Sequence, residues 1–393
     1  MYLYSLNPAE QNICEKAGSF LQSNFWGAFK ARFGWKALAF NAVVNAPSAD
    51  GPPADAPQAQ GEIFRAEVSL LVLHRRLGPG ISFAYVPWGP ELPPDCRVNA
   101  RSETAAEIAL LLRKFLPPDT AFIRFDFPWY TEEIDGTTGT AGTAGTGETV
   151  RRPFVKAAVE VQPPDSVLVD LQPEEAAILG AMKAKWRYNV GLAEKKGVVV
   201  RKAVSSLNGG LDRLMGELEK FYGIYKETAA RDGISIHNIE YYAALFETAA
   251  AYGVDTRLYL ASHEGEDIAG IVTLYRGLEA VYLYGASANH KRNLMAPYAL
   301  QWQAMRDAKA AGCGFYDLYG IPPVSPETDP NHPMAGLYRF KTGFIGENGA
   351  GGKIIHRPGS WDYSFRPLAK ALYSAAEKTR KKMWDIKKKH KRR

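Results

Sequence analysis

The 393-residue sequence contains little cysteine and no long apolar run, and both features limit the class of protein. Its three cysteines, Cys14, Cys96 and Cys313, are scattered and have no metal-ligand spacing, so we expect reduced thiols and no metal centre. No apolar stretch approaches the ~18 residues that span a bilayer. The N-terminal segment lacks a basic stretch followed by an apolar core, which predicts no signal peptide and a cytoplasmic protein.

Net positive charge is also absent outside one segment. Residues 378–393 hold ten Lys or Arg against one Asp, and without them the chain has 38 basic and 41 acidic residues. The net charge of +6 therefore belongs to this tail. A cluster of this kind binds phosphates, either on RNA or on anionic lipid head groups at the inner face of a membrane. The alternative is a solvated C-terminal helix without a partner.

Apolar periodicity predicts strands that alternate with amphipathic helices, an α/β pattern, and the length suggests two domains. The predicted strands cover 62–76, 81–90, 121–127, 166–171, 198–203 and a hairpin over 256–277 that turns at Gly265. The predicted helices cover 102–116 with Ser102 as N-cap, 173–197, 210–231, 238–252 and 296–311.

The domain boundaries follow from this pattern and from one biased segment. We expect a first domain over 1–164, completed by 346–377, a second domain over 165–345, and the tail. The Gly/Thr/Ala tract at 136–149 has nothing to bury and predicts a flexible insertion. It lacks the lysine and the strand–helix context of a phosphate-binding loop.

The most informative stretch is 281–320, where a strand, a helix and a second strand follow one another. Polar side chains gather at the strand ends, where α/β folds tend to bind ligands: Tyr282, Tyr284, Ser287, Tyr316, Asp317 and Tyr319. The whole sequence has no Ser/His/Asp or Cys/His arrangement with catalytic spacing. The simpler proposal is therefore direct attack on a substrate, without a covalent enzyme intermediate.

Seven segments, in order along nearly the whole chain, resemble motifs of the FemABX family of peptidoglycan-bridge aminoacyltransferases. They are FLQSNFWGAFKARFGWKA (20–37), YVPWGP (85–90), MKAKWRYNVGLAEKKGV (182–198), TAARDGISIHNIEYY (228–242), VYLYGASANHKRNLMAPYAL (281–300), YDLYGI (316–321) and YRFKTGFIG (338–346). The resemblance implies two tandem GNAT-like α/β domains with mixed sheets flanked by helices. The segment between Val200 and Arg231 is too short for the helical-hairpin arm of some relatives.

The resemblance also implies an activity. It is the transfer of an amino acid from aminoacyl-tRNA to the side-chain amine at position 3 of the stem peptide of a muramyl-pentapeptide precursor, nucleotide-linked or lipid-linked. Neither a metal nor an organic cofactor is implied, and we expect a monomer. Two alternatives stay open: an acyl-CoA-dependent acyltransferase of the same fold that acts on a polysaccharide or amine, and a non-catalytic scaffold that binds tRNA or a membrane.

The chemistry needs a deprotonated amine and a cation or donor for the oxyanion that forms at the ester carbonyl. Lys341, beside Phe340 in an aromatic stretch, matches the family's catalytic lysine; the alternative is an exposed lysine on a strand. Asp126 matches a family aspartate and is our candidate for a base or for positioning the acceptor; the alternative is an Asp that caps a turn before Pro128.

The resemblance implies that Lys30, Tyr241 and Tyr284 bind the precursor, and Tyr319 is a further candidate. Lys36 is a second phosphate candidate because it is close to Lys30 in a helix-like stretch. His237 occupies the place where relatives often have Arg. It cannot form the bidentate contact that an arginine makes with a phosphate. Either the diphosphate is held differently from the way relatives hold it, or the acceptor differs between the nucleotide-linked and the lipid-linked form.

For tRNA the candidates are the basic helix and one turn: Lys183, Lys185, Arg187, Lys195 and Lys196, with Lys291 and Arg292. The alternative is a solvated helix face. KRNLMAPY, at 291–298, stands where GNAT enzymes hold the CoA pyrophosphate, but it lacks the glycines that let backbone N–H groups approach phosphates. CoA is therefore not the expected donor.

Overall fold

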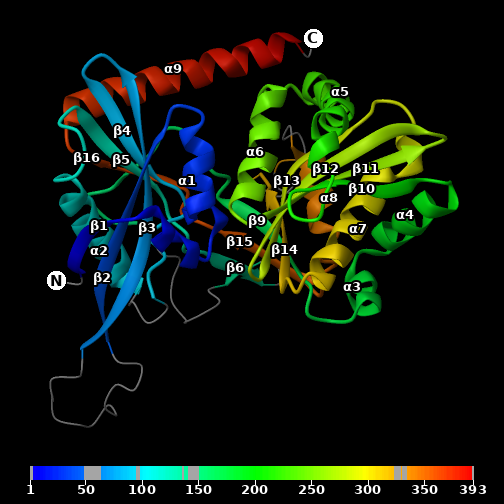
Figure 1. The fold of residues 1–393 in the computed structure, drawn as a ribbon, viewed down its shortest axis with the longest axis horizontal. Helices are drawn as coiled ribbons and strands as arrows, with labels where there is room; N and C mark the ends of the chain where they lie inside the picture. Colours follow the sequence, from blue (N-terminus) through cyan, green and yellow to red (C-terminus); the bar gives the residue numbers. More distant parts are fainter. Residues whose placement is uncertain are drawn as a thin grey trace. The chain divides into compact units, whose positions relative to one another are not determined.

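The computed structural model describes residues 3–47, 63–93, 98–134, 137–139, 150–322, 329 and 334–391. The chain divides into two compact units, each built on its own mixed sheet (Figure 1). Unit 1 comprises Met1–Tyr130, Thr143–Pro164 and Arg357–Arg393, and unit 2 comprises Thr131–Gly142 and Asp165–His356.

Within the described part of unit 1, the strand order is β1-β2-β3-β4-β5-β16-β8. The strands are β1 (Leu3–Ala9), β2 (Lys36–Pro47), β3 (Ile63–Gly78), β4 (Ile81–Val86), β5 (Thr120–Asp126), β8 (Val155–Lys156) and β16 (Ser360–Ser364). Neighbouring strands are antiparallel except β4 and β5, which are parallel. The helix that connects these two strands, α2 (Val98–Leu112), buries Ile108 and Leu112 in the core.

In unit 2 the described strands have the order β10-β11-β12-β13-β14-β9-β15-β6-β7. They are β6 (Thr131–Ile134), β7 (Thr137–Gly139), β9 (Asp165–Asp170), β10 (Val199–Ser205), β11 (Asp255–His263), β12 (Glu266–Arg276), β13 (Glu279–Ser287), β14 (Phe315–Gly320) and β15 (Gly352–His356). Only one described pair, β13 with β14, is parallel, and α7 (Ala296–Ala310) connects its strands.

The two sheets share one plan. In each, an antiparallel run of strands is followed by a parallel pair joined by a helix, and an antiparallel strand then continues the sheet. The predicted fold class, two GNAT-like α/β domains with mixed sheets flanked by helices, is confirmed. The chain between β10 and α6 (Ile239–Ala251) contains α5 (Leu214–Asp232) and the short turn η3 (Leu211–Arg213), without a hairpin arm.

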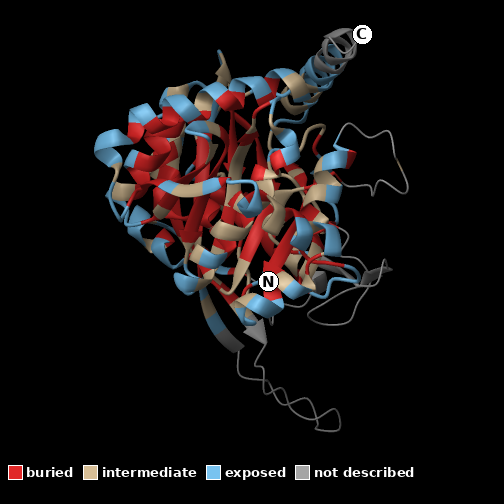
Figure 2. Cartoon of the chain, turned by 90° about the vertical axis from the view of Figure 1, so that its right-hand side faces the viewer, coloured by how far each residue is buried: buried red, intermediate tan, exposed pale blue. Residues whose placement is uncertain are grey.

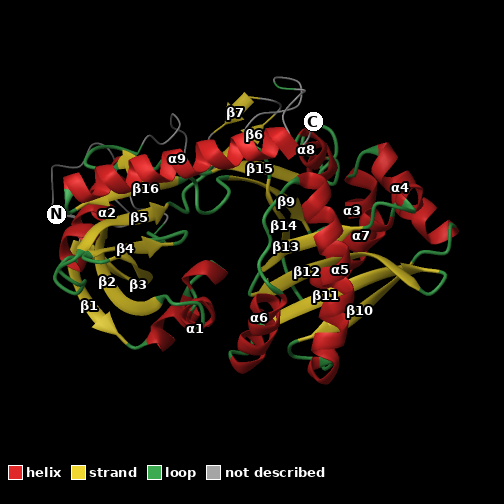
Figure 3. Ribbon diagram, turned by 90° about the horizontal axis from the view of Figure 1, so that it is seen from above, coloured by secondary structure: helices red, strands yellow, loops and turns green. Residues whose placement is uncertain are grey.

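Helices cover the sheet of unit 2 on both faces (Figure 3). On one side α5 packs on the sheet: a side chain at Gly270 in β12 would meet Phe221 of α5. From the other side, α7 accepts a hydrogen bond from the Tyr275 hydroxyl at the Ala304 carbonyl, 3.0 Å away. Figure 2 shows the buried residues between these helix layers. Unit 1 also contains η1 (Gln11–Lys16), η2 (Phe20–Gln22), α1 (Asn24–Ala31) and α9 (Pro367–Lys391).

Two predicted helices differ from the observed ones. The helix expected over 102–116 runs from Val98 to Leu112, so Ser102 is buried inside it instead of capping it. The helix expected over 173–197 is two helices, α3 (Glu175–Ala181) and α4 (Ala184–Lys195). The backbone is extended at Lys183, whose N–H donates to the Gly343 carbonyl across 3.0 Å.

The chain crosses between the units at different residues from those expected. The sequence places 346–356 with the first domain, but β15 pairs with β9 and β6 in unit 2, so the return to unit 1 begins at Arg357. Of the tract at 136–149, residues 137–139 form β7, and 136 and 140–149 lie outside the described residues. Among the helices described, none is long and apolar enough to cross a bilayer.

Candidate active site

Lys341 lies in unit 2 on α8 (Ala335–Thr342) and is buried, with 6% of its surface exposed. Its Nζ donates to the carbonyls of Tyr319 at 3.2 Å and Gly320 at 2.9 Å. It also lies 5.3 Å from the centre of the Tyr282 ring. The alternative of an exposed lysine on a strand is wrong. Lys341 is buried, belongs to a helix, and its side chain points to the end of β14.

A turn at the end of β14 presents the two carbonyls to Lys341. Tyr319 has φ +59°, a left-handed conformation that costs free energy for a residue with a side chain. Its N–H donates to Asp317 Oδ1 across 2.7 Å, and the same oxygen accepts the Ser166 hydroxyl. Asp317 and Ser166, both buried, thus hold the turn in the conformation that directs its carbonyls to Lys341.

Burial dominates the ionisation of this lysine. Transfer of the ammonium from water into the protein lowers the pKa of Lys341 to about 7, and the negative charge of Asp317 acts in the opposite direction. Near neutral pH the group is therefore divided between its charged and neutral forms. A residue that can supply a cation or exchange a proton at this pH suits acyl transfer.

Aromatic side chains fix α8 in place. The Trp186 indole Nε1 donates to the Phe340 carbonyl at 2.9 Å, and a side chain at Gly343 would overlap the Trp186 ring. Tyr298 packs edge-on against both Trp186 and Phe340, with ring centres 5.7 and 5.2 Å apart. The half-buried Phe340 therefore serves to hold the helix that carries Lys341, and Trp186 connects that helix to the basic helix α4.

A cluster of tyrosines continues the site along the same unit. Tyr241 on α6 and Tyr284 on β13 are hydrogen-bonded, and burial raises the pKa of Tyr241 to about 12. Burial also raises the pKa of Tyr284, as do the hydroxyls of neighbouring tyrosines that include Tyr319. The exposed His237 ring stacks flat on Tyr241, 3.8 Å between centres. The structure thus brings together His237, Tyr241, Tyr284, Tyr319 and Lys341.

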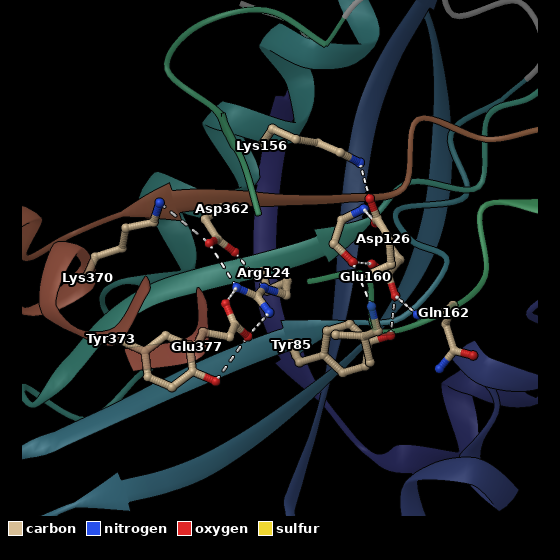
Figure 4. A network of polar contacts seen from close by, with 12 residues as sticks. Tyr85, Arg124, Asp126, Lys156, Glu160, Gln162, Asp362, Lys370, Tyr373 and Glu377 are labelled. Carbon is tan, nitrogen blue, oxygen red and sulfur yellow. Dashed lines mark hydrogen bonds and ion pairs between the residues drawn. The ribbon is translucent and has the colours of Figure 1, made fainter. Parts of the chain in front are cut away.

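Asp126 lies in unit 1 at the end of β5 and is 2% exposed (Figure 4). Its carboxylate accepts the hydroxyls of Tyr85 and Ser360 and, at 3.1 Å, the N–H of Gln162. Burial raises the pKa of Asp126 to about 6, although the two hydroxyl hydrogen bonds lower it. A carboxyl group with this pKa can accept a proton near neutral pH. The contacts observed are with Tyr85, Ser360 and Gln162, none of them in the turn before Pro128.

Lys30 and Lys36, also in unit 1, lie in different environments. Lys30 lies in the last turn of α1 among the rings of Trp26, Phe29 and Trp35, with Nζ 5.5 to 5.9 Å from their centres. Burial and the charge of Arg75 lower the pKa of Lys30 to about 8. The expectation that Lys36 continues the same helix is wrong: α1 ends at Ala31, and the exposed Lys36 begins β2 opposite His74.

The residues predicted to bind tRNA fall into two groups. On α4, Lys185 and Lys195 are exposed, and of the two residues that flank this helix Lys196 is exposed and Lys183 is half-buried. Arg187 instead caps α3 by donating to the Gly180 carbonyl at 2.9 Å and to that of Met182. In the other group, before α7, Lys291 forms ion pairs with Glu266 at 2.9 Å and Glu264 at 3.5 Å, whereas Arg292 is exposed. The charge of Lys291 is thus compensated within the protein.

The turn before α7 also uses its own backbone donors. The N–H groups of Leu294, Met295 and Tyr298 donate to carbonyls within the segment, and Pro297 has no N–H. These donors are therefore not directed toward a ligand.

Unit 1 contains a Ser/His/Asp contact that the sequence spacing does not reveal. Ser82 Oγ lies 2.9 Å from His74 Nε2 and 3.0 Å from Asp119 Oδ1. It does not have the geometry of a nucleophile, because the aspartate contacts the serine and not the histidine, and Ser82 is fully buried.

Ser166 and Trp186 also belong to the site and were not predicted from the sequence, whereas Tyr282 and Asp317 were expected at the strand ends but without a specific role. Of these residues, Asp317 had a local sequence signal. It is a carboxylate within an apolar strand, and it lies two residues before Tyr319, whose N–H it accepts. Ser166 is 151 residues away from its partner in the sequence.

The fold and the site define a protein of two tandem GNAT-like units with a buried lysine at the end of a strand of the second sheet. The solved structure of FemX shares this fold, with a TM-score of 0.65, 16% sequence identity, and coverage of 94% of this chain and 100% of FemX. The sequence profile of the FemAB family matches residues 152–267 and 259–378. The chain belongs to the FemAB family.

Curated relatives match parts of the chain. The UDP-N-acetylmuramoylpentapeptide-lysine N(6)-alanyltransferase of Weissella viridescens is 29% identical over 188 residues, which are 47% of this chain and 50% of the relative. A Lipid II:glycine glycyltransferase of Staphylococcus saprophyticus is 22% identical over 284 residues, which cover 57% of this chain and 63% of the relative. A glycyltransferase of the same name from Staphylococcus epidermidis is 29% identical over 128 residues, which cover 33% of this chain and 28% of the relative. The chain thus spans less than two thirds of the length of these relatives.

Proposed function

We propose that this protein is an aminoacyltransferase that moves an amino acid from aminoacyl-tRNA to the side-chain amine at position 3 of a peptidoglycan precursor stem peptide. The amine nitrogen attacks the ester carbonyl of the donor, the C–N bond forms, and the C–O bond to the tRNA breaks. The amine loses a proton and the released tRNA hydroxyl gains one. The product is the first residue of an interpeptide bridge.

The observation that carries the proposal is Lys341, buried on α8 and held by the carbonyls of Tyr319 and Gly320. Its ammonium can stabilise the oxyanion that forms when the amine attacks. With a pKa of about 7 it keeps a substantial charged fraction at neutral pH, in surroundings where a charge has a stronger effect than in water. Phe340 and Trp186 keep the lysine in place.

Other predicted residues receive roles under the same proposal. Lys30 supplies a cation for the precursor diphosphate, with Lys36 as a weaker candidate because it is exposed on β2. Tyr241, Tyr284 and Tyr319 supply hydroxyls and aromatic faces for the muramyl peptide. Asp126 accepts a proton or positions the acceptor amine.

The names of the relatives support the acceptor class. One is named for alanyl transfer to the lysine of a nucleotide-linked muramyl pentapeptide, and others for glycyl transfer to lipid II. The exposed lysines of α4 supply the backbone contacts for tRNA. A tRNA-dependent enzyme that uses these precursors works in the cytoplasm.

An acyl-CoA donor is the competing proposal. It requires free backbone N–H groups before α7, where the N–H groups of Leu294, Met295 and Tyr298 donate within the segment. Lys291, the nearby cation, is paired with two glutamates. Both observations favour aminoacyl-tRNA over CoA.

A transfer assay with the purified full chain tests the proposal. Bulk tRNA charged with labelled amino acids is offered with the nucleotide-linked or the lipid-linked muramyl pentapeptide, and the products are identified by mass. We expect the stem peptide to gain one aminoacyl residue, with loss of the gain in Lys341→Met. No transfer to either acceptor by folded protein, together with transfer from acetyl-CoA, rejects the proposal in favour of the competing one.

A further inference from the structure

The C-terminal helix α9 is attached to unit 1 by one of its faces (Figure 4). Glu377 pairs with the buried Arg124 through two hydrogen bonds of 2.8 and 3.0 Å. The Tyr373 ring packs at a tilt against Phe122, 5.2 Å between centres, and Lys370 lies 3.7 Å from Asp362. Residues 370, 373 and 377 have helical spacing, so they form a single face.

The opposite face of α9 carries apolar side chains that contact solvent. Leu368 is 84% exposed, Leu372 74% and Met383 55%. Ala376 and Thr379, between Leu372 and Met383, are also exposed. Residues 368, 372, 376, 379 and 383 are spaced by three or four residues, which places all five along one side of the helix. Figure 2 shows the exposed turns of α9 near the C-terminus. We call this set of five residues the apolar stripe.

Basic side chains surround α9 beside the apolar stripe. Lys378 and Lys382 lie toward one side of the stripe, Arg380 lies 5.9 Å from the centre of the Tyr373 ring, and Lys381 follows Glu377 by one turn. Lys378, Arg380, Lys381 and Lys382 are all exposed, and no acidic residue lies between 378 and 383. The rest of the chain is slightly acidic, so the positive charge is concentrated on this helix. A helix with exposed leucines on one side and lysines beside them has the composition of a segment that lies in a membrane interface.

We propose that the outward face of α9 is a docking surface for an anionic lipid bilayer. The leucines and Met383 enter the boundary between head groups and acyl chains, and Lys378 and Lys382 beside the stripe contact the lipid phosphates. Charge complementarity identifies this occupant. RNA needs the basic groups but does not account for leucines exposed in one stripe, and a second copy of the chain would bring its own lysines against these. The inference does not depend on the proposed catalytic function.

Vesicle co-sedimentation of the full-length protein tests the proposal, with phosphatidylcholine/phosphatidylglycerol vesicles compared with pure phosphatidylcholine. We expect binding to the anionic vesicles only, weakened by added salt. Lys378→Glu/Lys382→Glu should weaken it by about tenfold or more, since each lysine near an anionic surface contributes about a fivefold gain in binding. Leu368→Glu/Leu372→Glu should weaken it by a comparable or larger factor, because it removes the side chains that enter the interface.

Matched controls separate the helix from general effects of charge and apolarity. Lys114→Glu/Lys202→Glu makes the same charge change at two exposed lysines elsewhere, and Leu110→Glu replaces another exposed leucine. Both controls should bind like the unchanged protein. The leucine and lysine pairs are exposed and make no contact that holds α9, so circular dichroism and thermal unfolding should remain unchanged in every variant.

Three results overturn the proposal. One is failure of the unchanged protein to bind anionic vesicles, or equal binding to neutral ones. The second is unchanged vesicle binding in the Lys378/Lys382 variant together with weakened tRNA binding in a gel-shift assay, which assigns the face to RNA. The third is self-association of the unchanged protein, measured by light scattering, that the leucine variant abolishes without any change in vesicle binding.

Discussion

The ammonium of Lys341 lies 2.9 Å from the carbonyl oxygen of Gly320, a contact that joins α8 to the end of β14. Two carbonyl dipoles, from Tyr319 and Gly320, partly replace the water that the lysine loses on burial. They are held by a turn that depends on Asp317. The position and the pKa of the lysine are therefore set by residues outside its own helix.

Lys341 should set the upper part of the pH profile. The acceptor amine, with a pKa of about 10.4, gains reactive free base as pH rises. Lys341 is needed in its protonated form, which is lost as pH rises through about 7. The two effects cancel above that pH, so log kcat/KM should rise at low pH and level off above about 7.

Two variants check this assignment. Lys341→Met should lower kcat by about 10²- to 10³-fold, the usual effect of losing an oxyanion donor. Lys341→Arg keeps a charge that does not titrate, so its log kcat/KM should continue to rise above pH 7 from a lower starting value. A common levelling point for the Arg variant and the unchanged enzyme would assign the ionisation to another group.

Asp317→Asn should move the levelling point to lower pH. The negative charge of Asp317 raises the pKa of Lys341, so its removal lowers that pKa below about 7. The Asn side-chain oxygen can still accept the Tyr319 N–H, which preserves the turn. The measurement is kcat/KM against pH, with the exposed Asp212→Asn as the control. A lower rate without a shifted profile indicates that Asp317 has a purely structural role.

Lys185 and Lys291 should differ in their contribution to tRNA binding. Lys185 is exposed on α4, whereas Lys291 is neutralised by Glu264 and Glu266. Lys185→Ala should weaken tRNA binding and reduce the slope of log K against log salt by about 1. Lys291→Ala should change the affinity by less than about twofold. Filter binding over a salt series measures both, and the reverse order of effects contradicts the assignment of α4 to tRNA.

Glu377→Gln should destabilise unit 1 by about 2 kcal/mol, because it leaves the buried Arg124 guanidinium with Asp362 as its remaining carboxylate partner. Glu175→Gln breaks an ion pair with Arg306 in which both side chains are half-exposed to solvent, and should cost less than about 1 kcal/mol. Urea unfolding measures the two variants. Equal small effects would show that α9 is held mainly by the packing of Tyr373.

The local parts of the fold were predictable. The hairpin with its turn at Gly265 and the helix that ends at Asp232 before Gly233 follow from alternation, helical periodicity and glycine at a positive φ. The break between α3 and α4 was not predictable. It depends on Lys183 bonding to Gly343, 160 residues further along the chain, and the helical pattern of 173–197 continues through it.

The sequence by itself determined the alternation of strands and helices in the α/β pattern, the family, and Lys341 as the leading candidate, because these depend on local pattern and motif. Tertiary structure alone decided that Ser166 and Tyr319 both bond to Asp317, that β15 belongs to unit 2, and that Glu377 meets Arg124. Each of these depends on strand pairing or helix docking between distant segments. Their free energies come from burial and long-range hydrogen bonds, which no local window of sequence contains.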